Sequence, residues 1–83
     1  MKLLITGGAG FIGSNFTRWI LAREPGVSVV NLDKLTYAGN PENLRGLDAG
    51  CHRFLRGDVA DPAAVEEAIF GCDALVHFAA ETH

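Results

Sequence analysis

The sequence predicts an α/β fold in which about four parallel strands form one sheet with helices on both of its faces. Three observations predict this fold. Short apolar runs alternate with stretches of helical periodicity along the 83 residues, which is typical of chains that build parallel sheets from strand–helix–strand units. A cluster of glycines separates the first apolar run from the first helical stretch. Polar residues follow the ends of the later apolar runs.

The first strand and the first helix are predicted between residues 3 and 26. Residues 3–5 form a short apolar run, as expected for a strand that is buried on both faces. An apolar face with helical spacing follows, made of Ile12, Phe16, Trp19 and Ile20. Arg18 and Arg23 lie outside this face. Pro25 and Gly26 then end the helix.

The middle of the chain predicts two further strands. Residues 27–32 form a second apolar run, which ends at Asp33. Residues 34–50 are punctuated by glycine, proline and asparagine, so we expect an irregular connection with one short helical turn at 42–44. A third strand is predicted over residues 52–56.

The last third predicts a second helix and a fourth strand. Asp61 is a good N-cap and Pro62 suits the first helical position. The apolar face of this helix consists of Val65, Ala68 and Ile69. Gly71 ends the helix, and residues 74–78 form the fourth strand, in which we expect His77 to be a hydrogen-bonded core histidine.

Composition excludes several classes of function. Seven basic and ten acidic residues give a net charge of -3, which argues against nucleic-acid binding because phosphates require a basic surface. Cys51 and Cys72 fit no redox or zinc spacing, so we expect buried thiols in a reducing compartment. We expect no metal site. Glycines end the first apolar run too early for a signal peptide or a membrane span, so the sequence predicts a cytoplasmic protein without a membrane partner.

Residues 6–13 carry the strongest motif in the chain. Gly8, Gly10 and Gly13 match the spacing G-x-G-x-x-G, and Gly7, Gly10 and Gly13 match the related G-x-x-G-x-x-G. One glycine lets the chain turn sharply from strand to helix, and one lets the backbone approach a pyrophosphate. Gly13 lets the helix pack closely on the strand. The helix that follows lacks a side chain suited to capping its first turn, which is expected if a bound phosphate caps it.

Asp33 adds the second half of the motif. It closes the second strand twenty residues after Gly13, where a carboxylate can accept hydrogen bonds from the hydroxyls of an adenosine ribose. Such a carboxylate repels a 2′-phosphate and favours NAD over NADP, although Lys34 next to it weakens that preference slightly. A P-loop is excluded because no Gly-Lys-Ser/Thr follows the glycines.

Topology brings these segments together. In a parallel sheet all strands end at the same edge, where open α/β sheets bind ligands. The segments that follow strand ends are residues 7–13, Asp33, Asp58 and residues 78–82. The sequence therefore predicts the first half of a doubly wound Rossmann sheet with a dinucleotide at this edge.

Two groups of residues resemble a known family. Residues 6–13, Thr-Gly-Gly-Ala-Gly-Phe-Ile-Gly, resemble the N-terminus of the extended short-chain dehydrogenase/reductase family. Residues 33–40, Asp-Lys-Leu-Thr-Tyr-Ala-Gly-Asn, and residues 77–83, His-Phe-Ala-Ala-Glu-Thr-His, are similar to the dTDP-glucose 4,6-dehydratases of deoxysugar (for example rhamnose) biosynthesis. The resemblance covers the whole chain. The family pattern has leucine at position 78 and serine at position 82, so this chain departs from it at both.

The resemblance implies a cofactor site for NAD made of Gly7, Gly10, Phe11, Ile12, Gly13, Asp33, Lys34, Leu35, Thr36, Asp58, Val59, Phe78, Ala79, Ala80, Glu81 and Thr82. In it, the backbone of 11–12 lies against the pyrophosphate, residues 33–36 surround the ribose, and 58–59 meet the adenine. Residues 78–82 run toward the nicotinamide, and Thr82 and His83 lie near the nucleotide-sugar substrate.

Several of these residues also have a purely structural interpretation. Asp58 can form a turn after the third strand, and Thr36 can be loop surface. Glu81 fits a role in holding its loop better than proton transfer. His83 can be a substrate-site residue or simply the end of the chain.

The resemblance further implies a lyase that oxidises C4 of dTDP-glucose, eliminates water across C5 and C6 and returns the hydride to C6. The Tyr-x-x-x-Lys motif of the family is absent, because position 41, four residues after the single tyrosine, Tyr37, is proline. No catalytic residue is therefore expected in residues 1–83, which we interpret as the N-terminal part of the NAD-binding domain of a longer, homodimeric enzyme. On this interpretation residues 1–83 alone are inactive. Two alternatives remain: a nucleotide-sugar 4-epimerase, and a non-catalytic dinucleotide-sensing module.

Overall fold

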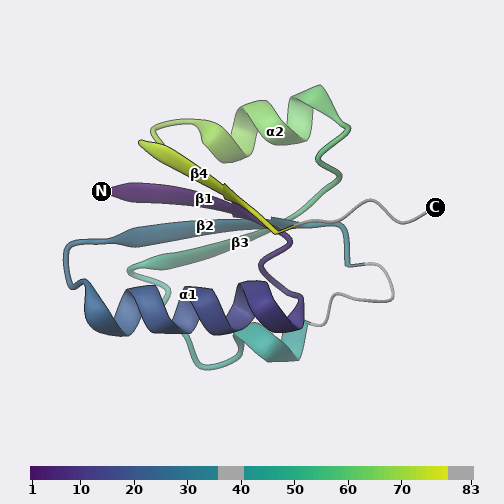
Figure 1. Ribbon diagram of the computed structural model, residues 1–83. Helices are drawn as coiled ribbons and strands as arrows, with labels where there is room; N and C mark the ends of the chain where they lie inside the picture. The colour runs from purple at the N-terminus through teal and green to yellow at the C-terminus, as the bar shows by residue number, and fades with distance from the viewer. Residues whose placement is uncertain (36–40, 79–83) are drawn as a thin grey trace.

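The computed structural model describes residues 1–35 and 41–78 and contains one sheet between two helical layers (Figure 1). Its elements, in chain order, are β1 (Lys2–Thr6), α1 (Phe11–Arg23), β2 (Ser28–Asp33), the 3-10 helix η1 (Pro41–Leu44), β3 (His52–Arg56), α2 (Pro62–Ile69) and β4 (Ala74–His77). The predicted order of elements is confirmed, and the boundaries agree to within two residues.

The sheet is parallel throughout, with strand order β3-β2-β1-β4. The chain moves outward from β1 through β2 to β3 and then returns to the other side of β1. This reversal of direction lies between β1 and β4, and it is the kind of switch point at which doubly wound sheets bind ligands. In Figure 1, α2 covers one face of the sheet, while α1 and η1 lie on the other. The predicted helices on both faces are confirmed.

The two faces of the sheet carry separate apolar clusters. Buried residues of β1 and β2 alternate between them, because successive side chains of a strand point to opposite faces. The cluster on the α2 side contains Leu4, Val30, Leu32 and Ala68. The cluster on the α1 side contains Leu3, Ile5 and Val29, with Phe16, Ile20 and Phe78 packed against it. Burial on both faces explains the nearly continuous apolar runs of β1 and β2.

The buried face of α1 differs from the predicted one. Ile12 is 71% exposed and Trp19 is 52% exposed, so neither belongs to the core. The buried residues of the helix are instead Gly13, Ser14 and Thr17. The reason is close approach: a Cβ on Gly13 would lie 2.3 Å from the carbonyl oxygen of Gly7. Because the helix backbone lies this near the turn, small side chains fill the interface, and the larger Phe16 and Ile20 pack at its side.

The expectation that His77 lies in the core is wrong. Its side chain is exposed, although it does form the expected hydrogen bond, through Nδ1 to the hydroxyl of Thr6. Leu75, two residues earlier and on the same face of β4, is 53% exposed. On this side of the sheet α2 packs mainly over β2. Ile69, at the end of α2 and part of the predicted apolar face, is also exposed.

The two cysteines are free thiols, as expected, but each is only partly buried. Burial is still sufficient to raise the pKa of the Cys72 thiol, with the neighbouring Asp73 as a smaller cause and Lys2 opposing it. Across residues 1–35 and 41–78, no helix combines the length and the apolar character needed to cross a bilayer.

Candidate functional site

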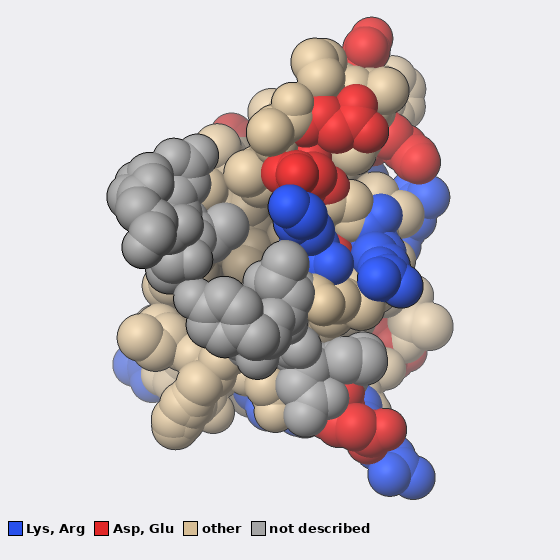
Figure 2. Space-filling view, turned by 90° about the vertical axis from the view of Figure 1, so that its right-hand side faces the viewer, with Lys and Arg blue, Asp and Glu red and all other residues tan. Residues whose placement is uncertain are grey.

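The predicted segments meet at the carboxyl edge of the sheet. The Gly7 N–H donates to the carbonyl oxygen of Leu32 at 2.9 Å, and the Gly57 N–H donates to that of Asp33 at 3.1 Å. The Phe78 N–H donates to the Thr6 carbonyl at 2.8 Å. The ends of all four strands are thus held together by backbone bonds. Figure 2 looks onto this edge and shows acidic and basic side chains next to each other toward the α2 side.

Three of the four glycines of the turn, Gly7, Gly8 and Gly13, could not carry a side chain without strain or collision. Gly7 has φ +74°, in the left-handed region that favours glycine. A Cβ on Gly8 would lie 1.6 Å from Oδ1 of Asn31. The close approach expected at Gly13 is present, and its partner is the turn immediately after β1. Gly10 has φ −75°, which any residue can adopt, so its backbone conformation does not require glycine.

The carbonyl groups of the turn accept hydrogen bonds from the protein. The oxygen of Gly7 accepts from the Gly10 N–H at 3.2 Å, and that of Gly10 accepts from the Ser14 N–H at 2.9 Å. The oxygen of Ala9 accepts from Nδ2 of Asn43 at 2.8 Å. A bound anion is attracted by N–H groups and repelled by carbonyl oxygens, so a turn whose carbonyls are engaged elsewhere suits a diphosphate.

The N-terminus of α1 carries no competing group. Gly10 is its N-cap, and in the described part of the chain no side chain caps it and no acidic residue lies in its first turn. The first N–H groups of a helix have no partner within the helix and carry a partial positive charge. Phe11 and Ile12 supply two of these groups, and their side chains are exposed rather than folded over the turn. The expected absence of a side-chain cap is confirmed, and the turn fits a diphosphate.

The Asp33 side chain is hydrogen-bonded to the glycine turn. Its Oδ2 accepts from the Ala9 N–H at 2.9 Å, and its Oδ1 accepts from the Leu35 N–H at 2.8 Å. An ionised carboxylate has about four acceptor positions, so each oxygen can still accept a hydroxyl. The same side chain therefore joins the glycine turn to the end of β2 and remains able to bind a ribose.

Leu35 has φ +59°, a left-handed conformation that is uncommon for a residue with a large side chain. The bond from its N–H to Asp33 stabilises this conformation as an Asx turn. The backbone thus bends sharply directly after Asp33. This bend lies within the predicted ribose segment 33–36, of which Thr36 is outside the described residues.

Asp58 forms both a turn and an ion pair. Its Oδ1 accepts from the Ala60 N–H at 2.9 Å, which is the structural interpretation considered for this residue. Its Oδ2 lies 3.2 Å from Nζ of Lys34. The Ala60 N–H and, next, Lys34 lower the pKa of the Asp58 carboxyl, against a smaller opposing effect of burial. The pair joins two predicted cofactor segments, while Val59 packs against the core on the α2 side.

The remaining predicted residues follow β4. The ring of Phe78 is partly buried, with its centre 5.5 Å from that of Phe16 on α1. Ala79, Ala80, Glu81, Thr82 and His83 lie outside the described residues. Among residues 1–35 and 41–78 there is no group of three or more His, Cys, Asp or Glu side chains that could hold a metal ion.

Sequence reasoning missed a buried polar network under the turn. Asn31 is fully buried, and its Nδ2 lies 3.2 Å from the Thr17 hydroxyl and 2.8 Å from Nε2 of His52. Its Oδ1, which faces Gly8, has no hydrogen-bond partner. Burial, and to a smaller extent Arg18, lowers the pKa of His52. The signal was a single asparagine inside the apolar run of the second strand. The contact of Asn43 with the turn was also not predicted, because Asn43 lies in an irregular connection that has no apolar run in which a polar residue would stand out.

Curated relatives match this chain along its whole length. It is 52% identical over 84 residues to the low-salt glycan biosynthesis protein Agl12 of Haloferax volcanii. It is 51% identical over 88 residues to a dTDP-glucose 4,6-dehydratase of Streptomyces niveus, and 49% identical over 83 residues to one of Mycolicibacterium smegmatis. All of this chain is covered in each case, but it spans only 25–27% of the length of these relatives.

Solved structures agree with the fold. A dTDP-glucose 4,6-dehydratase of Bacillus anthracis in complex with NAD has a TM-score of 0.91 at 38% identity, covering 98% of this chain and 27% of that one. One of Streptomyces venezuelae, also solved with NAD, has a TM-score of 0.89 at 51% identity, covering 100% and 27%. A UDP-glucose 4-epimerase of Thermus thermophilus in complex with NAD has a TM-score of 0.80 at 39% identity, covering 99% and 25%.

A protein-family model also matches the chain. The model described as the NAD dependent epimerase/dehydratase family matches residues 3–83, which include the glycine turn, Asp33 and the segment after β4. The NAD dependence of that family and the NAD in the solved relatives confirm the expected cofactor. The resemblance of the sequence to dTDP-glucose 4,6-dehydratases is likewise confirmed. The chain belongs to the NAD dependent epimerase/dehydratase family.

Proposed function

We propose that this chain is the NAD-binding N-terminal part of a nucleotide-sugar 4,6-dehydratase that converts dTDP-glucose to dTDP-4-keto-6-deoxyglucose. The observation that supports it best is the position of the Asp33 carboxylate, one hydrogen bond from the glycine turn and beside an uncapped helix N-terminus. A diphosphate next to a ribose presents one anionic and one hydroxyl-rich group, which matches this pair of features.

In this proposal each part of the site binds one part of NAD. Gly7 and Gly10 let the backbone approach the diphosphate, which the N–H groups of Phe11 and Ile12 bind, and Gly13 lets α1 pack closely on the turn. Asp33 accepts from the adenosine ribose, with Lys34, Leu35 and Thr36 around it. Asp58 and Val59 border the adenine. Residues 78–82 border the nicotinamide side, and Thr82 and His83 lie toward the nucleotide sugar.

Bound NAD supplies the hydride acceptor and donor for oxidation at C4 and reduction at C6 of the hexose, with loss of water between these steps. Residues 1–83 position the cofactor for this reaction and hold no catalytic residue. We place the Tyr-x-x-x-Lys pair, the rest of the NAD-binding domain and the substrate domain in a longer protein. The family resemblance also supports a homodimer in the cytoplasm.

A 4-epimerase is the nearest alternative. The solved epimerases share the fold, at 30–39% identity, and two of them were solved in complex with NAD. Two observations favour the dehydratase: identity to curated dehydratases of 45–51%, and the segment Asp-Lys-Leu-Thr-Tyr-Ala-Gly-Asn at 33–40. A non-catalytic sensing module is the second alternative, and it requires the full-length protein to lack Tyr-x-x-x-Lys.

Calorimetric titration of the full-length protein with NAD and NADP tests the cofactor site. Replacing Asp33 by alanine leaves the ribose hydroxyls unpaired, and we expect NAD affinity to fall by about 1–3 kcal/mol. NADP affinity falls less, because the repulsion of its 2′-phosphate is also removed. Asp61→Ala is the matched control, since Asp61 also accepts from a backbone N–H but does so at α2. Unchanged NAD affinity in Asp33→Ala would remove this residue from the site.

Mass spectrometry of the products distinguishes the three functions. With dTDP-glucose and NAD, a dehydratase forms a product lighter by one water. An epimerase leaves the mass unchanged and inverts a hydroxyl, which proton NMR detects. A sensing module returns the substrate unaltered. The proposal is wrong if the full-length protein binds NAD but releases no water from dTDP-glucose.

A further inference from the structure

The middle of the glycine turn is held from two sides. Ala9 is fully buried, and its N–H donates to Asp33, while its carbonyl oxygen accepts from Nδ2 of Asn43 at 2.8 Å. These two bonds fix the peptide groups on either side of Ala9. Asn43 belongs to η1, 34 residues further along the chain. A segment that follows β2 therefore controls the orientation of a peptide group that follows β1.

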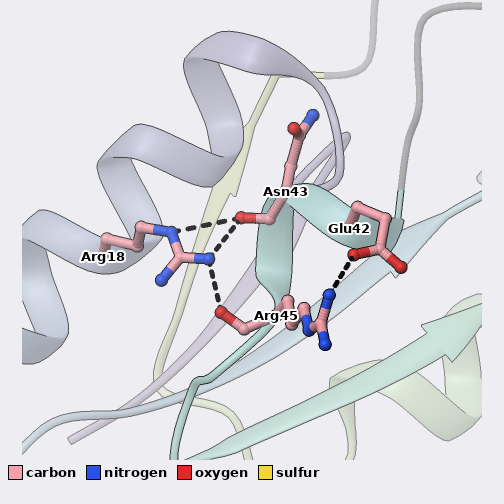
Figure 3. Close-up of polar contacts among 4 residues, drawn as sticks. All are labelled: Arg18, Glu42, Asn43 and Arg45. Atoms are coloured by element: carbon pink, nitrogen blue, oxygen red, sulfur yellow. Dashed lines mark hydrogen bonds and ion pairs between the residues drawn. The ribbon is translucent and has the colours of Figure 1, made fainter.

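Arg18 holds η1 in place for this contact. Its guanidinium reaches from α1 and donates to the Asn43 carbonyl oxygen through Nε at 3.1 Å and through Nη2 at 2.8 Å (Figure 3). Nη2 also donates to the carbonyl oxygen of Arg45 at 2.6 Å. The last carbonyls of a helix have no partner within it, and a cation stabilises them. Leu44, between the two, is buried.

These contacts form a closed ring. α1 starts directly after the glycine turn, and Arg18 lies two helical turns into it. From Arg18 the contacts run to the backbone of η1, through the Asn43 side chain to Ala9, and back to the start of α1. The ring includes the glycine turn through the Ala9 carbonyl oxygen, which accepts from Asn43. If this carbonyl instead faced a bound diphosphate, its partial negative charge would repel the anion.

We propose that Asn43 and Arg18 are positioning residues for the diphosphate: Asn43 keeps the Ala9 carbonyl turned toward η1, and Arg18 keeps Asn43 in place. The inference rests on the proposed binding of NAD at this turn. Neither residue touches the cofactor in this account. Both act on the diphosphate subsite and leave the adenosine subsite unchanged.

The test measures binding of NAD, ADP and adenosine to the full-length protein by calorimetry. ADP carries the diphosphate and adenosine lacks it, so a variant that loses more affinity for ADP than for adenosine is altered at the diphosphate subsite. We expect Asn43→Ala and Arg18→Gln to weaken NAD and ADP about fivefold, the usual net effect of one hydrogen bond, and adenosine less than about twofold. Arg45→Gln is the matched control: its side chain pairs with Glu42 on the surface at 3.4 Å, and its backbone carbonyl, which Arg18 binds, is retained.

Arg18→Lys is a second variant if Asn43→Ala lowers the melting temperature below the assay temperature. Lysine keeps the charge but loses the fork that reaches two carbonyls, so a selective loss of ADP affinity is again expected. Equal losses for ADP and adenosine, or unchanged ADP affinity in the Asn43 and Arg18 variants, overturn the inference while NAD binding by the wild type stands. A wild-type protein that binds no NAD overturns the proposed function and the inference together.

Discussion

Substitution of Gly8 by alanine probes the contact between the glycine turn and the strand beneath it. The added Cβ would lie 1.6 Å from Oδ1 and 2.2 Å from Cγ of Asn31, far inside van der Waals contact. Asn31 is fully buried, so its amide can move only by giving up its contacts with Thr17 and His52. Overpacking and two lost hydrogen bonds together predict a destabilisation of about 2–4 kcal/mol.

The clash involves a side chain, so a second substitution should relieve it. In an Asn31→Ala background the added methyl group meets no amide, and we expect Gly8→Ala to cost less than about 1 kcal/mol there. Gly13→Ala is the contrasting case, because its Cβ would meet the backbone oxygen of Gly7 at 2.3 Å. Removal of the Asn31 side chain should not rescue that variant.

Urea titration of the cofactor-free protein, carried out for the single and double variants, gives the coupling free energy. We expect a coupling of about 1 kcal/mol or more between positions 8 and 31 and less than about 0.5 kcal/mol between positions 13 and 31. Additive effects at positions 8 and 31 would refute the claim that Asn31 is the reason why position 8 requires glycine.

Two further predictions concern charged and titrating groups. Asp58→Asn removes the partner of Lys34 and frees its ammonium for a 2′-phosphate, so the ratio of NADP to NAD dissociation constants should fall about two- to fivefold. Both cofactors contain adenine, so this ratio is insensitive to any adenine contact, and an unchanged ratio would show that the pair has no part in the preference. His52 has a lowered pKa in the folded protein, so the unfolded state binds its proton more readily. Stability from this group is therefore present above the ordinary pKa of about 6.5 and is lost as the pH falls through the lowered value. The urea concentration at the unfolding midpoint should therefore decline between about pH 7.5 and about pH 5, which is roughly the range in which histidine titrates. We expect this decline to be less steep in His52→Gln than in the wild type. Equal slopes for the two proteins would contradict this assignment.

Most of the architecture could be predicted because β1 and β2 are buried on both faces. Their residues read as apolar runs bounded by glycine or aspartate, and the pattern admits few other interpretations. Asp61 and Pro62 marked the start of α2, and the Asp61 side chain does accept from the Ala63 N–H. These are local signals that hold wherever the segment packs.

The predicted face of α1 is right at Phe16 and Ile20, which pack against the core, but wrong at Ile12 and Trp19, which are exposed. A period of apolar residues locates the core face when side chains fill the interface. Here the absence of a side chain on Gly13 brings backbone to backbone, so Thr17 is buried and Ile12 is exposed. Similarly, His77 lies in an apolar run but is exposed, and α2 on that side of the sheet packs mainly over β2.

The candidate site also has a part that the sequence predicts and a part that it does not. The spacing of the glycines and Asp33 in the sequence identifies them as site residues, and the parallel topology predicts that they lie close together. The contacts of Asn43 with Ala9 and of Arg18 with η1 depend on how an irregular connection folds back, which no periodicity encodes. Asn31 was visible as a polar residue in an apolar strand, but its contact with Gly8 required the register of β1 and β2.

A crystal structure of the full-length protein with NAD would show directly whether the glycine turn and Asp33 bind the cofactor. We expect diphosphate oxygens within hydrogen-bond distance of the Phe11 and Ile12 N–H groups, and the adenosine ribose hydroxyls bound to Asp33. A diphosphate bound away from the start of α1, or an Asp33 carboxylate that contacts no part of NAD, would contradict it.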